Sequence, residues 1–302
     1  MSTSLISPAE RGYIREGIST GIRNDGRSRQ DFRDYIVNLD VISHSNGSAR
    51  CRVGYGTDVL VGVKAETMLL DPTQPPNQGK VVCHVECSPS VVRRWDQRTA
   101  DDLNNNLTQF LTRCLNQYGG IDLGKLCIIP GKACWVLYVD ALVLDFDGNL
   151  HDALLLAVRG ALFNTRIPEL NVQEVDEGEF DFEANSDPEA AQPVPGWEKV
   201  PLCVTLNRCG EHYFVDATAT EEQCTEAKLS VVINHLGEIC AVQKGALGAI
   251  PHQMYADMIQ SASHLVTQLL SALDERLQKE ASTNLANQNG KHVSTFIRKN
   301  FH

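Results

Sequence analysis

The stretch DGNLHDALLLAVRGALFNTRIP, residues 147–168, decides how the middle of this chain folds. It opens with an Asp-Gly turn, continues through the apolar run LLLAV, and ends at a proline. The preceding residues, CWVLYVDALVL at 134–144, are typical of a strand buried on both faces. The pattern predicts a strand, a tight turn and a buried helix that ends near Asn164, because the proline cannot continue it.

A turn of this kind, between a strand and a helix, is suited to holding an anion. The first N–H groups of the helix and its positive end point at one spot. The residues at this turn are Leu150 and His151, an apolar side chain and a mostly neutral imidazole. Neither is a good phosphate ligand. We therefore expect the architecture of an anion site without most of its chemistry.

The same stretch resembles the RNase PH superfamily, in the branch that forms the hexameric ring of the RNA exosome. Further matches are DGR at 25–27, GSARCRVGYGTDVLVGVKAE at 47–66, KLCIIPGKACWVLYVDALVLD at 125–145 and VDATATEE at 215–222. The chain is most similar to the ring subunits that are structurally required but not catalytic, counterparts of the archaeal inactive ring subunit. The resemblance implies an α+β fold in which two βαβα-type halves, with mixed sheets and packed helices, form one domain.

Composition and charge limit the class of protein. The chain has 302 residues, 42% of them hydrophobic, which is enough for a sizeable core. The net charge of −11 argues against a broadly basic, free-standing nucleic-acid binder. Eight acids and no base lie within residues 174–189, so most of the negative charge is local and RNA contact elsewhere is not excluded.

The cysteine pattern predicts free thiols in a reducing compartment. Ten cysteines are scattered without a CxxC pair, and Cys83 and Cys87 with His84 have no second ligand pair at zinc spacing. We therefore expect no metal site and no cofactor. No signal peptide and no apolar run of roughly 20 residues is present, which predicts a soluble intracellular protein without a membrane partner.

Local patterns divide the chain into segments. Ser7-Pro8-Ala9-Glu10 is a capping box that starts a helix to about residue 19, within an N-terminal helix and arm at 1–24. We expect one domain at 25–282, with a first half at about 25–170, a loop-like acidic insertion at 174–195 and a second half at about 198–282. A polar, frayed tail follows at 283–302. Strands are expected at 36–41, 49–53, 58–64, 81–87, 126–129, 134–144, 202–208, 213–216, 229–233 and 239–243, and helices at 101–118, 150–164 and 251–280.

The resemblance also identifies where catalytic groups would lie. Catalytic members grip phosphate with a Gly-Thr-Arg or Gly-Ser-Arg turn, which falls here at Asn149-Leu150-His151. Their two aspartates, six residues apart, correspond to Glu222 and Lys228. We expect these degenerate positions to form a local ion pair in place of a carboxylate pair, and the chain to lack enzymatic activity.

An active phosphate-dependent 3′–5′ exoribonuclease is the alternative. It would require Glu222 to work with Asp216 or Glu221, and a phosphate donor other than His151. Asp216 stands at the end of a strand, where a turn or capping role is the ordinary one. The DGR turn at 25–27 is likewise interpreted as a structural clamp.

Candidate RNA-binding residues come from one basic segment. VVRRWDQR places Arg93, Arg94 and Arg98 around Trp95, and Arg113 follows on the next helix. Arginines that track phosphates beside a stacking ring are typical of a single-stranded RNA channel. The competing interpretation is a solvated loop held down by Trp95. His44, His84, His212, His235 and His264 are isolated in the sequence and are expected to be surface or satisfied residues.

We therefore expect a non-catalytic ring subunit that helps guide single-stranded RNA to an associated 3′–5′ exoribonuclease. The resemblance implies other RNase PH-like ring subunits and S1 or KH cap subunits as partners. It also implies roles in ribosomal RNA maturation, messenger RNA decay and noncoding RNA turnover, in the nucleus including the nucleolus, and in the cytoplasm.

Overall fold

The computed structural model describes residues 6–70, 75–92, 97–117, 120–176, 179–185 and 190–289. The chain begins with helix α1 (Pro8–Thr20), whose first turn is capped by Ser7. The Ser7 hydroxyl accepts the N–H of Glu10 at 3.2 Å, and a proline occupies the first helical turn. The helix ends at Gly21, whose φ of 84° closes the last turn in the left-handed region.

The first half of the chain forms a six-stranded sheet in the order β1-β2-β3-β6-β4, with β5 pairing to β6. Only the β4–β6 pair is parallel in this sheet. Alternate residues of β1 and β4 are buried, so one face of the sheet is turned to the core. The strands are β1 (Tyr35–Leu39), β2 (Gly47–Val53), β3 (Thr57–Leu69), β4 (Lys80–Cys87), β5 (Cys127–Ile129) and β6 (Ala133–Asp145).

Helix α4 (Leu150–Asn164) is the centre of the molecule. Twelve of its fifteen residues are buried, including Arg159, whose guanidinium is paired with Asp274 at 2.8 Å. The helix packs on β2 and β3 of the first sheet and on β11 (Leu202–Cys209) of the second. Other helical segments of the first half are α2 (Pro89–Val92), α3 (Gln97–Thr112), a π-helical turn at Arg113–Gln117 and a 3-10 turn at Leu123–Leu126.

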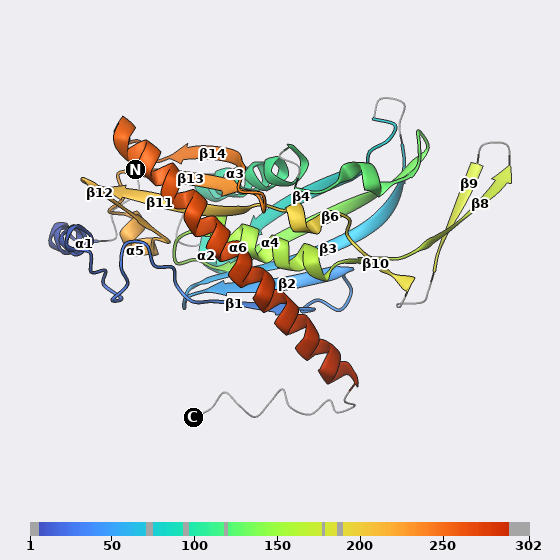
Figure 1. The fold of residues 1–302 in the computed structure, drawn as a ribbon, viewed down its shortest axis with the longest axis horizontal. Coiled ribbons are helices and arrows are strands. Elements are labelled where there is room, and N and C mark those ends of the chain that lie inside the picture. The colour runs from blue at the N-terminus through green and yellow to red at the C-terminus, as the bar shows by residue number, and fades with distance from the viewer. Residues whose placement is uncertain are drawn as a thin grey trace.

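The second half is a four-stranded antiparallel sheet in the order β12-β11-β13-β14. The long helix α6 (His252–Asn289) packs on β11 and β13 of this sheet and also reaches β1 of the first (Figure 1). One continuous cluster of buried apolar side chains runs through both halves, so the halves share a core. The remaining elements here are a 3-10 turn at Trp197–Lys199, β12 (His212–Val215), α5 (Ala219–Glu222), β13 (Ala227–Ile233) and β14 (Ile239–Gly245).

Two expectations from the sequence are wrong. The acidic segment is not merely a loop, because β8 (Leu170–Asp176) and β9 (Glu179–Ala184) pair as an antiparallel hairpin that extends away from the body (Figure 1). The short strands β7 (Arg166–Ile167) and β10 (Gln192–Pro193) pair at its base. The polar tail is not frayed from its start, because α6 continues as far as Asn289. Polarity did not distinguish a solvated hairpin or helix end from a loop.

Candidate functional site

The turn before α4 lies where the two halves meet. Gly148 has a φ of 83°, and a Cβ there would collide with the backbone of Ala217 and Thr218 in the second half. Asn149 follows with a φ of 58° and forms the N-cap position of α4. Thr57 fixes the turn, because its hydroxyl accepts the Asp147 N–H at 3.1 Å and donates to the Gly148 carbonyl at 2.8 Å. The expected strand, tight turn and buried helix are therefore present.

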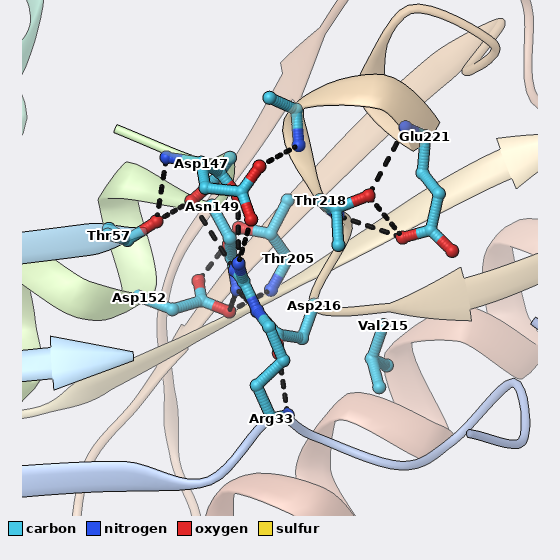
Figure 2. Close-up of polar contacts among 12 residues, drawn as sticks. Arg33, Thr57, Asp147, Asn149, Asp152, Thr205, Val215, Asp216, Thr218 and Glu221 are labelled. Carbon is cyan, nitrogen blue, oxygen red and sulfur yellow. Dashed lines mark hydrogen bonds and ion pairs between the residues drawn. The ribbon is translucent and has the colours of Figure 1, made fainter. Parts of the chain in front are cut away.

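A buried polar network fastens this turn to both halves (Figure 2). The Asn149 amide donates from Nδ2 to Asp152 and to Asp216, each at 2.8 Å. Arg33 donates from its guanidinium to both oxygens of Asp216, at 2.9 and 2.8 Å, and from its backbone N–H at 2.7 Å. Asp152 in turn accepts the N–H and the hydroxyl of Thr205 on β11 at 3.0 and 2.8 Å.

Burial and pairing set the charge of this network. Burial raises the pKa of Asp152 to about 6, although hydrogen bonds from Asn149 and Thr205 oppose the rise. Burial would also raise the pKa of Asp216, but the hydrogen bonds and charge of Arg33 outweigh it and hold the pKa below its ordinary value. Arg33 and Asp216 therefore form a fixed ion pair across the chain, from a segment before β1 to the loop after β12.

Glu222 occupies the place where an anion would meet α4. Its Oε1 accepts the Asn149 N–H at 3.1 Å and lies 2.6 Å from Lys228 Nζ. A reciprocal contact links the halves, because Asp147 Oδ1 accepts the Ala219 N–H at the start of α5 at 3.2 Å. The ion pair expected between Glu222 and Lys228 is thus present. A carboxylate of the chain itself accepts the N–H at this turn.

His151 is held neutral beside this ion pair. Burial lowers the pKa of His151 to about 4, and the nearby charge of Lys228 adds to the effect. Its ring meets Phe110 of α3 edge-on, with centroids 4.7 Å apart. An imidazole without charge at neutral pH cannot neutralise a phosphate. Leu150, the other degenerate position of the turn, is buried in the core.

The carboxylates that the alternative required are engaged elsewhere. Glu221 is paired with the fully buried Arg23 at 2.5 Å, and its side chain also closes a capping box with Thr218. Asp216 is paired with Arg33 and, at 3.0 Å, with Arg27. Both acids thus hold the segment between α1 and β1 against the second half. Arg27 belongs to the DGR turn, and these contacts agree with a clamp role for it.

The two candidate RNA-binding residues that the structure describes, Arg98 and Arg113, are not gathered in one place. Arg93 and Arg94 lie outside the described residues. Arg98 is exposed near the start of α3, and the exposed Arg113 follows the end of that helix, where it donates to Gln243 of β14 at 3.3 Å. Fifteen residues of helix separate these two arginines by about 22 Å, so they cannot bind the same phosphate.

The part of the chain that the structure describes contains neither a cluster of metal-ligating side chains nor a membrane-spanning helix. No group of three or more His, Cys, Asp or Glu residues there could hold a metal ion. Among the same residues, no helix combines the length and the apolar character needed to cross a membrane. All ten cysteines are free and eight are buried, and burial raises the pKa of Cys51 and of Cys83 to about 12. Such thiols are poor nucleophiles at neutral pH.

Sequence reasoning missed the partners that organise the site. No pattern in the sequence assigns a role to Arg33, Asp152 or Thr205. Arg33 lies 183 residues from Asp216 in the chain, so no local pattern could connect them. One available signal was the presence of an acid, Asp152, in the first turn of a predominantly apolar helix.

Comparison with known proteins places this geometry in a family. Residues 31–168 match the family model of domain 1 of the 3′ exoribonuclease family, and residues 199–264 match domain 2. A putative exosome complex exonuclease RRP42 of Dictyostelium discoideum is 33% identical over 320 residues, covering 91% of this chain and 98% of that protein. The exosome complex component Rrp42 of Methanopyrus kandleri is 35% identical, covering 87% and 95%.

Solved structures agree with the sequence matches. A chain of the Archaeoglobus fulgidus exosome with RNA bound to the active site superposes with a TM-score of 0.72 and 26% identity, over 87% of this chain and 96% of that one. A chain of an archaeal exosome core gives a TM-score of 0.69, also at 26% identity. The expected α+β, RNase PH-like fold is therefore confirmed. The chain belongs to the 3′ exoribonuclease family, also called the RNase PH family.

Proposed function

We propose that this chain is a non-catalytic structural subunit of an RNA exosome ring. Its place is among other RNase PH-like subunits, where it helps form the channel that guides single-stranded RNA to an associated 3′–5′ exoribonuclease. The names of its relatives support the exosome assignment, since two are called exosome complex components, a third is called a putative exosome complex exonuclease, and all match over most of both chains. The observation that supports a non-catalytic role is the contact of Glu222 with Lys228 and with the turn before α4.

Phosphorolysis requires groups that this site does not offer. A phosphate nucleophile must be held, the scissile phosphate must be neutralised, and a carboxylate pair must serve the leaving oxygen. Here the turn provides Leu150 and a neutral His151, and the second carboxylate position is Lys228. Each lost group removes several kcal/mol of transition-state stabilisation. Their joint loss supports an inert site.

An active exoribonuclease remains the second candidate only if another carboxylate joins Glu222. Asp216 and Glu221 are the acids that this alternative needs, and each is buried against an arginine. Moving either would leave that arginine buried without its partner, which costs about 3–5 kcal/mol. This cost argues against the alternative.

The exposed apolar side chains support assembly with a neighbour. Leu236, Ile239, Val242 and Leu247 are 68%, 47%, 38% and 105% exposed on and around β14. This strand is at the edge of its sheet, so its outer backbone groups have no strand partner among the described elements. By contrast, β1 at the edge of the first sheet is partly covered, because its carbonyls accept hydrogen bonds from Arg276 and Asn284 of α6. An open apolar edge is suited to contact with another subunit.

The remaining parts of the proposal rest on the family resemblance. The basic segment with Arg93, Arg94 and Arg98, together with Arg113, is proposed to border the RNA channel. Cap subunits of the S1 or KH type would bind one face of the ring and a processive nuclease the other. The assembly would act in ribosomal RNA maturation, messenger RNA decay and noncoding RNA turnover, in the nucleus, the nucleolus and the cytoplasm.

Reconstitution tests the structural role. The chain should co-elute in size-exclusion chromatography with an RNase PH-like ring subunit from the same source, and omitting it should prevent a closed ring. Val242→Lys should weaken this association, because it places a charge on the open edge, whereas Tyr55→Lys, at a fully exposed site between β2 and β3, should not. A well-behaved monomer with no affinity for any ring paralogue would contradict the proposal.

A further inference from the structure

A hollow of about 390 Å³ lies on the first sheet. Its floor comes from β3, β4 and β6, and one wall comes from the segment between β1 and β2. Val61 and Ala141 project into the core, so their neighbours along each strand belong to the opposite, open face. That face carries Leu60, Gly62 and Leu142 as part of the floor.

Strand register explains why the surface is hollow at this point. Gly62 on β3 is opposite Asp140 on β6, and Asp140 is also in register with His84 on β4. Because glycine has no side chain, the position beside Asp140 is empty. A Cβ at Gly62 would lie 3.2 Å from Cδ1 of Ile42, so the isoleucine marks the wall of the space.

The row below is apolar and ends in a second acid. Leu60 is in register with Leu142, and Leu142 with Glu86. Glu86 on β4 therefore lies diagonally across from Asp140 on β6, at a distance that a long side chain can span. The hollow thus combines an apolar floor with two carboxylates at its rim.

The charges around the rim are not balanced. Lys64 is the one lysine or arginine in the lining, and its ammonium is already paired with Glu66 at 2.5 Å. Within the described part of the chain, neither Asp140 nor Glu86 has a hydrogen-bonding or ion-pair partner for its side chain. His44 and His84, which the sequence leaves isolated, both line the hollow. The two unpaired carboxylates, beside one ammonium that is already paired, make the rim acidic.

We propose that this hollow is a docking site for a lysine or arginine side chain of a partner protein. Such a side chain has an apolar stem that fits the floor of Leu60 and Leu142, and a cationic head that reaches Asp140. The volume is within the usual range for a site that encloses a small group. Phosphate groups of RNA would be repelled by the same rim. This inference does not rest on the proposed exosome role.

Small probes test the site on the isolated chain. The probes are N-butylguanidinium, which mimics an arginine side chain, butyrate, which reverses the charge, and butanol, which has none. Binding is followed by ¹⁵N TROSY spectra of the deuterated protein at about pH 8, where imidazoles are neutral. Butylguanidinium should shift the amide resonances of Gly62, Asp140 and Leu142, and the other two probes should bind more weakly.

Two variants and a control complete the test. Asp140→Asn should weaken butylguanidinium binding about two- to fivefold, the effect of removing one exposed ion pair. Gly62→Val should abolish the shifts by filling the hollow, with an unchanged melting temperature to show that the chain still folds. Asp257→Asn, an exposed acid on α6, should change nothing. Equal binding of butyrate and butylguanidinium, or an unaltered affinity in Asp140→Asn, would overturn the inference.

Discussion

Lys228 Nζ lies 2.6 Å from Glu222 Oε1, and the same carboxylate oxygen accepts the N–H of Asn149 at the start of α4. These two residues are at the positions where the resemblance implies a pair of catalytic acids. The change from a carboxylate to an ammonium at Lys228 alters more than charge. The Lys228 ammonium holds Glu222 against the turn before α4. There Glu222 occupies the N–H group of Asn149, which an incoming anion would need.

Replacing Lys228 tests what that pair contributes. Lys228→Ala should lower the free energy of unfolding by about 0.5–1 kcal/mol, because the pair is only partly screened from solvent. Urea denaturation measures the change. Lys64→Ala, which removes the exposed pair with Glu66, is the matched control and should cost less. A loss no larger at Lys228 than at Lys64 would show that the pair does not stabilise the site.

Arg33 should matter far more than any surface arginine. Arg33→Ala removes two guanidinium hydrogen bonds to the buried Asp216 and leaves Arg27 as its remaining cation, which should cost about 3 kcal/mol of unfolding free energy. Arg52 is half-exposed where it pairs with Asp58, so Arg52→Ala should lower the free energy of unfolding by less than about 1 kcal/mol. In a double-mutant cycle, Asp216→Asn should recover part of the Arg33→Ala loss. Equal losses at Arg33 and Arg52 would contradict the network described above.

His151 predicts an acid sensitivity of stability. The unfolded chain has an ordinary histidine pKa of 6.5, whereas burial lowers the folded value to about 4. Between these values the unfolded state binds the proton more readily, so stability is complete above pH 6.5 and falls as the pH drops towards 4. The loss should reach about 2–3 kcal/mol.

His151→Phe should remove this contribution while keeping the packing on Phe110. Asp152 acts in the opposite direction, since its folded pKa of about 6 exceeds the ordinary 3.8 and acidification below pH 6 favours the folded state. The comparison is therefore made between wild type and variant at each pH, by urea denaturation. Identical pH profiles for the two proteins would rule out His151 as the titrating group.

The separation of Arg98 and Arg113 predicts independent effects on RNA. In the assembled particle, Arg98→Glu and Arg113→Glu should each weaken RNA protection, and the double variant should show the sum. Each lost phosphate contact should lower the slope of log affinity against log salt by about 1. Lys279→Glu on α6 is the charge-matched control. Unchanged protection in both arginine variants would exclude them from the channel.

Much of the fold could be predicted from the sequence because its signals are local. The expected helices at 150–164 and 251–280 and the expected strand at 134–144 agree with α4, α6 and β6 within a few residues at most ends. Period-2 alternation and helical spacing report burial directly. The acidic hairpin was missed because its strands pair only with each other, and polar composition was taken as evidence for a loop.

The site was harder to predict because its contacts are distant in sequence. Glu222 and Lys228 are six residues apart, and their ion pair could be expected from the exchange of charge that the family resemblance implies. The contact between Glu222 and Asn149 spans 73 residues, and that between Arg33 and Asp216 spans 183. No spacing rule covers such pairs, and they depend on the packing of the two sheets around α4.

The central claim is that the chain keeps the shape of the family without its chemistry. The most direct measurement is phosphorolysis by the purified chain, with oligo(A), inorganic phosphate and Mg²⁺. We predict no release of nucleoside diphosphates above a protein-free control. Release that depends on phosphate and disappears in Glu222→Ala would contradict the account.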